Sequence, residues 1–240
     1  NPNWESSLVP MARPLQAEGA DGACEEGRAS AGGPVRFVSI ACGKASTFAL
    51  TREGALFACG WNNFGQLGLG YTSSGVMSLE RVPVPNDEAI THVSSGAVHT
   101  CVVTSSGRLL GCGFNGHGQL ADLPKKPNPS TSLVLLHMPS ATHMPSVTCQ
   151  PALVRSVTCG YEHTCVLRLD GSLWTCGRNK NGTCALGSSE LRVPEFHQVH
   201  APAGRSCRAV FCEVSCGKGG SGGHTAVLYR VTPESPAFSQ

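Results

Sequence analysis

An internal repeat limits the folds open to this chain more than any other feature. Three copies share the same spacing of glycines and hydrophobic residues, and they occupy 38–70, 92–123 and 156–187. A fourth copy starts at 213 and stops early. Successive copies are 53, 64 and 57 residues apart, counted between their first glycines, which are Gly43, Gly96, Gly160 and Gly217. A pattern that is repeated within the chain, with connectors of variable length between the copies, indicates a repeat architecture.

Each copy has the local pattern of short antiparallel strands. In the third copy, "HTCVLRL" leads into Asp170-Gly171, a strong hairpin signal, and "SLWTCG" returns as the partner strand. We expect a fourth strand within 80–85, 150–154 and 191–196, where the prolines are compatible with an edge strand. Four short strands in each period predict the blades of a β-propeller.

Two of the copies carry a specific resemblance. "ACGKASTFALTREGALFACGWNNFGQLGLG" (41–70) and "CGYEHTCVLRLDGSLWTCGRNKNGTCALG" (159–187) resemble repeats of the regulator of chromosome condensation family. In that family each unit begins with small-small-Gly-x-x-His-Thr and ends with Asn-x-x-Gly-Gln-Leu-Gly. The resemblance covers 36–230 and implies a propeller that has seven blades when complete. The expected fold is therefore all-β, with blades of four antiparallel strands making about half of a seven-bladed ring.

The chain departs from the family pattern at several places. Ser46 replaces the usual histidine of the first unit, and "GTCALG" replaces Gln-Leu-Gly in the third. A glycine-rich insertion precedes His224, and the usual tryptophan before the second hairpin glycine is a cysteine in three units. These cysteines are Cys59, Cys112 and Cys176.

The repeated glycines and histidines are expected to serve the fold. A catalytic set is not copied once per unit, whereas a packing device is, and a buried imidazole needs a hydrogen-bond partner. The expected structural positions are Gly43, Gly54, Gly60, Gly65, Gly96, Gly107, Gly113, Gly118, Gly160, Gly171, Gly177, Gly182, His99, His163 and His224.

The repeat also predicts the domain organisation. Residues 1–34 have no sustained period and are expected to form an extended or disordered tail. Propeller repeats are expected over 35–232, with units starting near 38, 92, 156 and 213, followed by a tail at 233–240. Because the fourth unit lacks its second hairpin strand, we expect the chain to be a fragment, or its open sheet faces to be covered by other segments or another subunit.

The thirteen cysteines allow two interpretations. Most recur at repeat positions, which favours small buried core residues and free thiols. A two-residue turn at Ser106-Gly107 and Asp170-Gly171 would instead place Cys101 opposite Cys112 and Cys165 opposite Cys176 as possible disulfides, and a shift of one residue would separate these pairs. "CRAVFCEVSC" (207–216) matches no common zinc spacing, so no metal is expected.

Composition and motifs exclude several function classes. A net charge of +2 with 14% charged residues argues against a nucleic-acid-binding face. No apolar run approaches the ~20 residues of a membrane span, and no signal peptide is visible, which favours an intracellular, reducing compartment. "GKGGSG" (217–222) formally matches a dinucleotide fingerprint but lies in a β-repeat. No catalytic arrangement is evident, so neither an enzyme nor a cofactor is expected.

The remaining hypothesis is a scaffold that binds other protein subunits. Residues that vary between units on the expected loops are the binding candidates, and they are Trp61, Phe64, Phe114, His117, Arg178 and Lys180. Packing of Trp61 and Phe114 against the next blade is the structural alternative. The second functional hypothesis, from the activity for which the family is named, is guanine-nucleotide exchange on a small GTPase.

Overall fold

The computed structural model describes residues 35–121, 129–139, 153–200, 207–217 and 224–233. The predicted tails at 1–34 and 233–240 lie outside these ranges, except for Pro233. Apart from the short 3-10 turns η1 (Pro85–Asp87) and η2 (Lys180–Gly182), all regular elements in the described ranges are β-strands. The chain is therefore all-β where the structure describes it.

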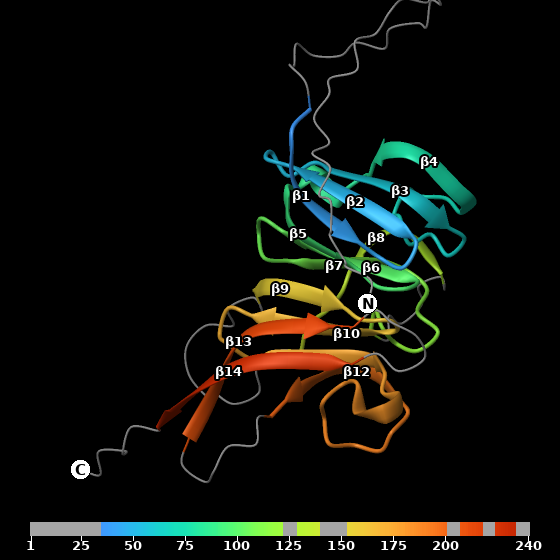
Figure 1. Cartoon of the computed structure of the whole chain (residues 1–240). Coiled ribbons are helices and arrows are strands. Elements are labelled where there is room, and N and C mark those ends of the chain that lie inside the picture. The colour runs from blue at the N-terminus through green and yellow to red at the C-terminus, as the bar shows by residue number, and fades with distance from the viewer. Residues whose placement is uncertain (1–34, 122–128, 140–152, 201–206, 218–223, 234–240) are drawn as a thin grey trace, which may run out of the picture. The chain divides into compact units, whose positions relative to one another are not determined.

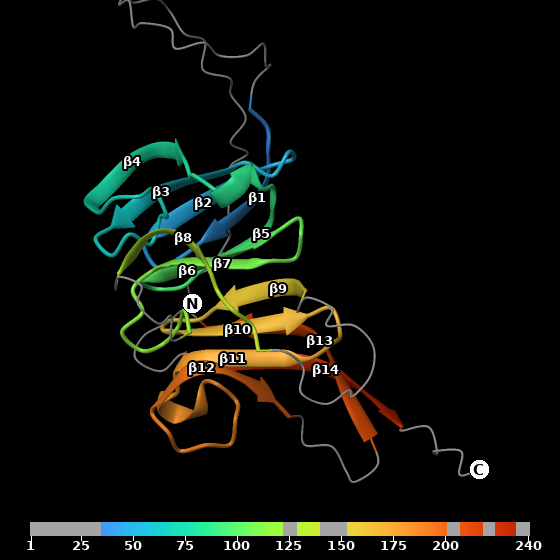
Figure 2. The same ribbon diagram turned by 180° about the vertical axis from the view of Figure 1, so that it is seen from behind.

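The strands form four successive antiparallel sheets (Figures 1 and 2). The first sheet contains β1 (Phe37–Cys42), β2 (Ser46–Thr51), β3 (Leu56–Asn62) and β4 (Ser73–Arg81). The second contains β5 (Ile90–Ser95), β6 (His99–Thr104), β7 (Leu109–Gly113) and β8 (Ser130–Leu135). The third contains β9 (Val154–Cys159), β10 (His163–Arg168), β11 (Leu173–Arg178) and β12 (Arg192–Val199). The fourth is the hairpin of β13 (Cys207–Cys216) and β14 (Thr225–Pro233).

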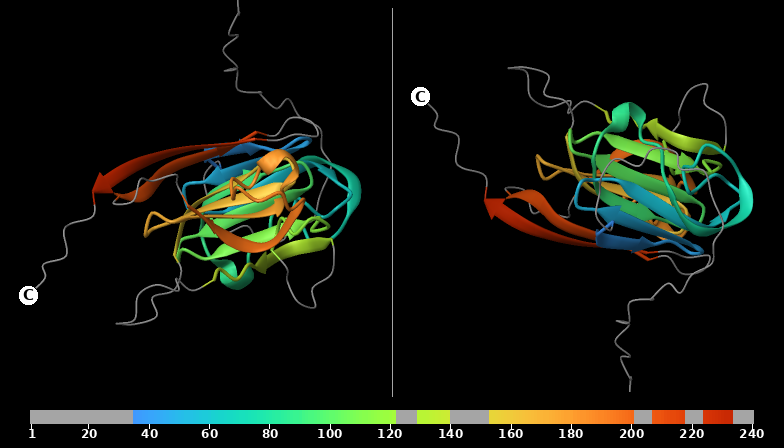
Figure 3. Two further views of the ribbon diagram at one scale, coloured as in Figure 1. Left: turned by 90° about the horizontal axis from the view of Figure 1, so that it is seen from below. Right: turned by 90° about the horizontal axis from the view of Figure 1, so that it is seen from above.

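The apolar core lies between neighbouring sheets. Viewed along the stack, successive sheets overlap and the β13–β14 hairpin extends beyond them (Figure 3). Burial of each large aliphatic or aromatic side chain between sheets stabilises the fold by about 1.5–3 kcal/mol. The layers include Phe48, Leu56, Val102 and Leu110 between the first and second sheets, Val103, Leu109, Val157 and Trp174 between the second and third, and Leu167, Leu173 and Phe211 between the third and fourth.

The hairpins differ by one residue from the register that would pair their cysteines. Cys112 lies opposite Thr100, and Cys176 lies opposite Thr164. In the second sheet the amide of Gly107 donates to the carbonyl of Thr104, and Gly107 has φ +75°, so the loop contains three residues instead of two. The extra loop residue moves the two cysteines to opposite faces, and all four hairpin cysteines are free thiols.

The expected fourth strand was correct in only one of the complete units. Residues 191–196 fall almost entirely within β12, with Pro194 on an outer-edge strand. In the second unit the fourth strand is β8, which lies in the long connector, whereas Val154 already begins β9. In the first unit β4 ends at Arg81, before most of the predicted segment. The proline-rich segments are thus compatible with an edge strand but do not specify one.

The repeated glycines meet two different backbone requirements. A Cβ at Gly96 would collide with the carbonyl of Gly160 and with the ring of His99, so a side chain there would separate adjacent sheets. A second group has positive φ, which glycine adopts without steric cost. Its members among the predicted structural positions are Gly54, Gly60, Gly65, Gly107, Gly113, Gly118, Gly171, Gly177 and Gly182.

Candidate functional site

One side of the stacked sheets is formed by matching loops from three units. The amide of Trp61 donates to the carbonyl of Ala45, and the same bond joins Phe114 to Val98. Arg178 and Glu162 repeat it in the third sheet. Each bond holds the loop after the third strand beside the turn between the first two strands. We name this surface the loop face, formed by turns 43–45, 96–98 and 160–162 and by loops 61–70, 114–121 and 178–187.

One asparagine in each loop bonds the loop backbone, and Asn62 and Asn179 are buried. Asn62 Oδ1 accepts from the amide of Leu67 at 3.1 Å, and its Nδ2 donates to the carbonyl of Tyr71 at 2.9 Å. Asn115 makes the same two kinds of bond to Leu120 and Ala121. The side chain thus replaces a missing backbone partner at both ends of the loop. The third unit repeats this arrangement with Asn179, although "GTCALG" replaces the usual ending.

Four of the six predicted binding residues form a continuous row of rings across two sheets. The ring centroids of Trp61 and Phe64 are 5.4 Å apart, and those of Phe64 and Phe114 are 5.3 Å apart. Phe114 then contacts His117 at 6.1 Å. All four side chains are half-buried, so each one both packs against a neighbour and presents a surface to solvent. We name Trp61, Phe64, Phe114 and His117 the aromatic row.

An ion pair extends the aromatic row into the third sheet. His117 Nε2 lies 3.7 Å from Glu162 Oε1, and Arg178 Nη1 lies 2.5 Å from Glu162 Oε2. Arg178, a fifth predicted binding residue, therefore lies at the end of the row. Lys180 is exposed in the neighbouring turn η2. The surface combines an apolar stretch with a charged end.

Three residues of the loop face were missed from the sequence. Glu162 is the carboxylate that joins His117 to Arg178. Lys44 donates to the hydroxyl of Tyr161 at 3.1 Å and lies 5.2 Å from its ring centroid, which links the first and third sheets. Lys44 and Tyr161 directly follow the repeated glycine, and Glu162 directly precedes the histidine. These two turn positions carry different residues in different units, and this variation could have identified them as binding candidates.

The repeated histidines connect one sheet to the next. His99 is buried and its Nε2 lies 2.9 Å from Thr164 Oγ1. His163 is likewise buried, with Nε2 2.8 Å from Thr225 Oγ1. In the β13–β14 hairpin, His224 is exposed. The first two imidazoles therefore lie in the core between sheets and not at the loop face.

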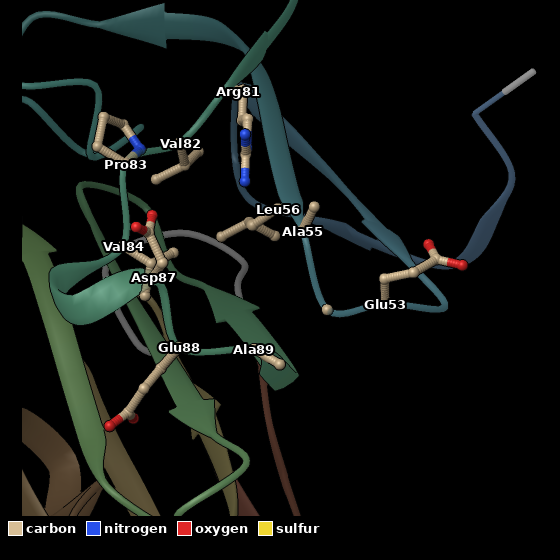
Figure 4. Close-up of a pocket in the computed structure, with 11 residues that line it drawn as sticks. Glu53, Ala55, Leu56, Arg81, Val82, Pro83, Val84, Asp87, Glu88 and Ala89 are labelled. Atoms are coloured by element: carbon tan, nitrogen blue, oxygen red, sulfur yellow. The ribbon is translucent and has the colours of Figure 1, made fainter. Parts of the chain in front are cut away.

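At the end of the first sheet that lies away from the loop face there is a hollow of about 390 Å³ (Figure 4). Arg81 and Asp87 line it, with Glu53 at its margin and the Leu56 side chain at its base. Glu88, also in the lining, forms an ion pair with Arg108. Hydrogen bonding from Thr104 holds the pKa of Glu88 below its usual range. The lining residues include no hydroxyl, thiol or imidazole side chain, so they offer no nucleophile–base pair.

Within the described residues, none of the helices is long and apolar enough to cross a membrane. The family model of the regulator of chromosome condensation (RCC1) repeat matches residues 37–66, 90–119 and 154–183. A second model of this repeat matches residues 53–103.

Known relatives agree with these matches. The ultraviolet-B receptor UVR8 of Arabidopsis thaliana is 27% identical over 224 residues, which are 88% of this chain and 46% of the relative. The secretion-regulating guanine nucleotide exchange factor of Bos taurus is 31% identical over 140 residues, which are 57% of this chain and 27% of the relative. The chain thus spans less than half of the length of these relatives.

The solved structures agree on the fold. Prp20p of Saccharomyces cerevisiae has a TM-score of 0.65 at 20% identity, over 83% of this chain and 44% of that protein. Human WBSCR16 has a TM-score of 0.63 at 21% identity, over 81% and 46% of the two chains. The chain therefore contains three regulator of chromosome condensation repeats, each lying within one four-stranded antiparallel sheet, and it has the β-propeller fold of these solved structures.

Proposed function

We propose that the chain is a β-propeller scaffold that binds another protein through the loop face. The observation that carries this proposal is the aromatic row, which crosses two sheets and ends at the Glu162–Arg178 ion pair of a third. Aromatic side chains and arginine are the residue types that dominate protein-binding hot spots. Loops held on a rigid scaffold are also where binding residues concentrate.

The chemistry of the loop face fits a protein segment with apolar side chains next to a charged group. The half-buried rings offer apolar contact, and Glu162 and Arg178 provide hydrogen-bond partners of both signs. A net charge of +2 gives no broad attraction for nucleic acid. Packing alone accounts for the contact between Phe64 and Phe114 but leaves the exposed part of each ring unexplained. We assign the protein to an intracellular, reducing compartment, with propeller repeats over 35–232.

The test compares two variants that each remove an apolar side chain. Phe64→Ala interrupts the aromatic row between its two sheets, whereas Met77→Ala removes a fully exposed apolar side chain from β4, outside the loop face. Wild type and both variants are used to capture proteins from the native source, and the captured proteins are quantified by mass spectrometry. We expect Phe64→Ala to lower recovery of the specific partners about tenfold, which corresponds to about 1.4 kcal/mol. Met77→Ala is expected to leave recovery unchanged.

Equal recovery with Phe64→Ala and wild type would contradict the proposal, provided that both proteins melt at the same temperature. Loss of recovery with both variants would also contradict it, because the effect would not belong to the loop face.

A second candidate function is guanine-nucleotide exchange on a small GTPase. It is favoured by the similarity to the secretion-regulating exchange factor and by the fold shared with Prp20p, a protein described with its binding to Gsp1p. A nucleotide-release assay over a panel of small GTPases separates the two functions. Accelerated release from one GTPase would support exchange, and unchanged release from a GTPase that the chain captures would support a scaffold.

A further inference from the structure

Two sets of one histidine and two cysteines recur at successive junctions between sheets. In the first set, a ring nitrogen of His99 and the sulfurs of Cys101 and Cys159 lie within 4.8 Å of one another. His99 and Cys101 belong to β6, and Cys159 belongs to β9 of the next sheet. The second set repeats this arrangement with His163, Cys165 and Cys216. All six residues are buried, Cys216 being the most exposed at 8%.

The hydroxyls of Thr164 and Thr225 determine that Nε2 of each histidine carries a proton. Thr164 Oγ1 donates its only proton to the carbonyl of Gln119 at 2.6 Å, so it accepts from His99 Nε2, which lies 2.9 Å away. When the ring is neutral, its lone pair is therefore on Nδ1, and this atom is buried without a hydrogen-bond partner among the described residues. Thr225 acts in the same way on His163, because it donates to the carbonyl of Thr183 at 2.7 Å. A neutral imidazole with a free lone pair is the form that binds a metal ion.

The two thiols of each set lie within 4.8 Å of each other. The sulfurs of Cys165 and Cys216 lie 3.4 Å apart and are hydrogen-bonded to each other. Two thiols in each set are thus within reach of one ion, and the thiolate is the form of cysteine that ligates metals.

We propose that each set binds one zinc ion between adjacent sheets. Nitrogen and sulfur are the donor atoms that zinc prefers, and bonds of about 2.0–2.3 Å place its ligand atoms about 3.5–3.8 Å apart. Binding releases both thiol protons, so two thiolates balance the 2+ charge and the buried complex is neutral. A neutral complex avoids the large desolvation cost of an uncompensated buried charge. Three protein ligands leave the fourth position to water or a hydroxyl, and Thr225 Oγ1 lies 3.7 Å from both sulfurs of the second set.

The junction between the first and second sheets provides an internal comparison. There the equivalent positions are Ser46, Phe48 and Ser95, and the two serine hydroxyls bond each other at 3.1 Å. This junction packs well with no thiol or imidazole at these positions, so the fold itself does not require the His-Cys-Cys set. The sets therefore predict two zinc ions per chain, not one for every junction.

The experiment measures bound metal on the full chain. Protein purified under reducing conditions is stripped with a chelator, dialysed against Zn²⁺ and analysed by elemental mass spectrometry. We expect two zinc ions per wild-type chain, one in Cys159→Ser or Cys216→Ser, and none in the double variant. Cys159→Ser reproduces the residue present at Ser95, which the fold tolerates. Cys112→Ser and Cys176→Ser are matched controls, because each removes a buried thiol outside the two sets and should leave two ions bound.

A readout on the wild type avoids dependence on variant folding. Co²⁺ substituted for Zn²⁺ should produce thiolate-to-metal charge-transfer absorption, saturating at two equivalents. Absence of this band would overturn the proposal, as would zinc loss in the control variants equal to that in Cys159→Ser. A Cys165–Cys216 disulfide in freshly purified protein, shown by a thiol count short by two and no bound zinc, would also overturn it. None of these outcomes depends on partner binding by the loop face.

Discussion

Single residues at one repeat position differ in their contacts from unit to unit. The position after the first turn is Ser46, His99 and His163 in successive sheets. Ser46 bonds Ser95, whereas each histidine bonds a threonine of the following sheet. The backbone geometry is thus repeated while the chemistry changes with the side chains that the next sheet supplies.

Alanine substitutions at Gly171 and Gly182 distinguish the cost of backbone strain from the cost of a steric collision. Both have positive φ, at +77° and +74°, but a Cβ on Gly171 would lie 2.6 Å from Val210 Cγ1, whereas one on Gly182 would have nothing within 4 Å. Gly182→Ala should therefore lower the free energy of unfolding by about 1 kcal/mol from strain alone. Gly171→Ala should cost more, about 1–3 kcal/mol, because β13 must also shift. Thermal melting of both variants measures the difference, and equal losses would show that Val210 does not pack on this turn.

Within one repeat unit, the loop after the third strand depends on a single side chain. Asn62 is fully buried and bonds the backbone of both Leu67 and Tyr71, so it fixes the segment that carries Trp61 and Phe64. The repeated asparagine therefore connects a buried structural role to the position of the exposed aromatic row.

Asn62→Ala should unfold the loop locally and destabilise the chain. The change leaves the buried amide of Leu67 without its partner, which costs about 1–3 kcal/mol, and it also removes the bond to the Tyr71 carbonyl. Chemical denaturation measures this loss, and hydrogen exchange of residues 61–70 should rise in the native state. Ser74→Ala, at an exposed position in β4, is the control and should change neither quantity. Unchanged exchange in Asn62→Ala would refute the role given to this side chain.

At the scale of the whole molecule, buried cysteines belong to each apolar layer between the described sheets. Burial raises the pKa of Cys184 to about 12, and burial also raises the pKa of Cys112 and Cys176. These groups remain protonated in the folded chain at pH values where an unfolded thiol ionises. They therefore make the stability of the sheet stack dependent on alkaline pH.

The free energy of unfolding should fall as the pH rises from about 9 towards about 12. In this window the unfolded chain loses the Cys184 proton first, because the folded pKa lies above the ordinary value of 9.0, and proton loss on unfolding favours the unfolded state. The contribution is fully present below about pH 9. Denaturant titrations at several pH values should show a shallower decline for Cys184→Ala than for wild type. Parallel declines would mean that Cys184 is not buried as a neutral thiol.

The repeat, the strands and the turn glycines could be predicted from local sequence because they depend on local rules. Alternating side chains specify a strand, and a glycine at a fixed spacing specifies a hairpin, whatever lies in the next unit. The variable loop residues were identified in the same way, since Trp61, Phe64, Phe114 and His117 occupy equivalent loop positions. That these four rings form one row could not be predicted, because the row depends on the contact between Phe64 and Phe114, which lie on loops of different sheets.

Contacts between sheets could not be predicted, because their partners are far apart in the chain. Cys101 and Cys159 are 58 residues apart and match no metal-binding spacing, yet stacking brings their sulfurs together beside His99. Glu162 joins His117 to Arg178 for the same reason. The register of the hairpin could not be predicted from the local sequence either. One additional residue in the loop places Cys112 opposite Thr100 instead of Cys101. Spacing along the chain determines the units, whereas the offset between stacked sheets determines which side chains meet.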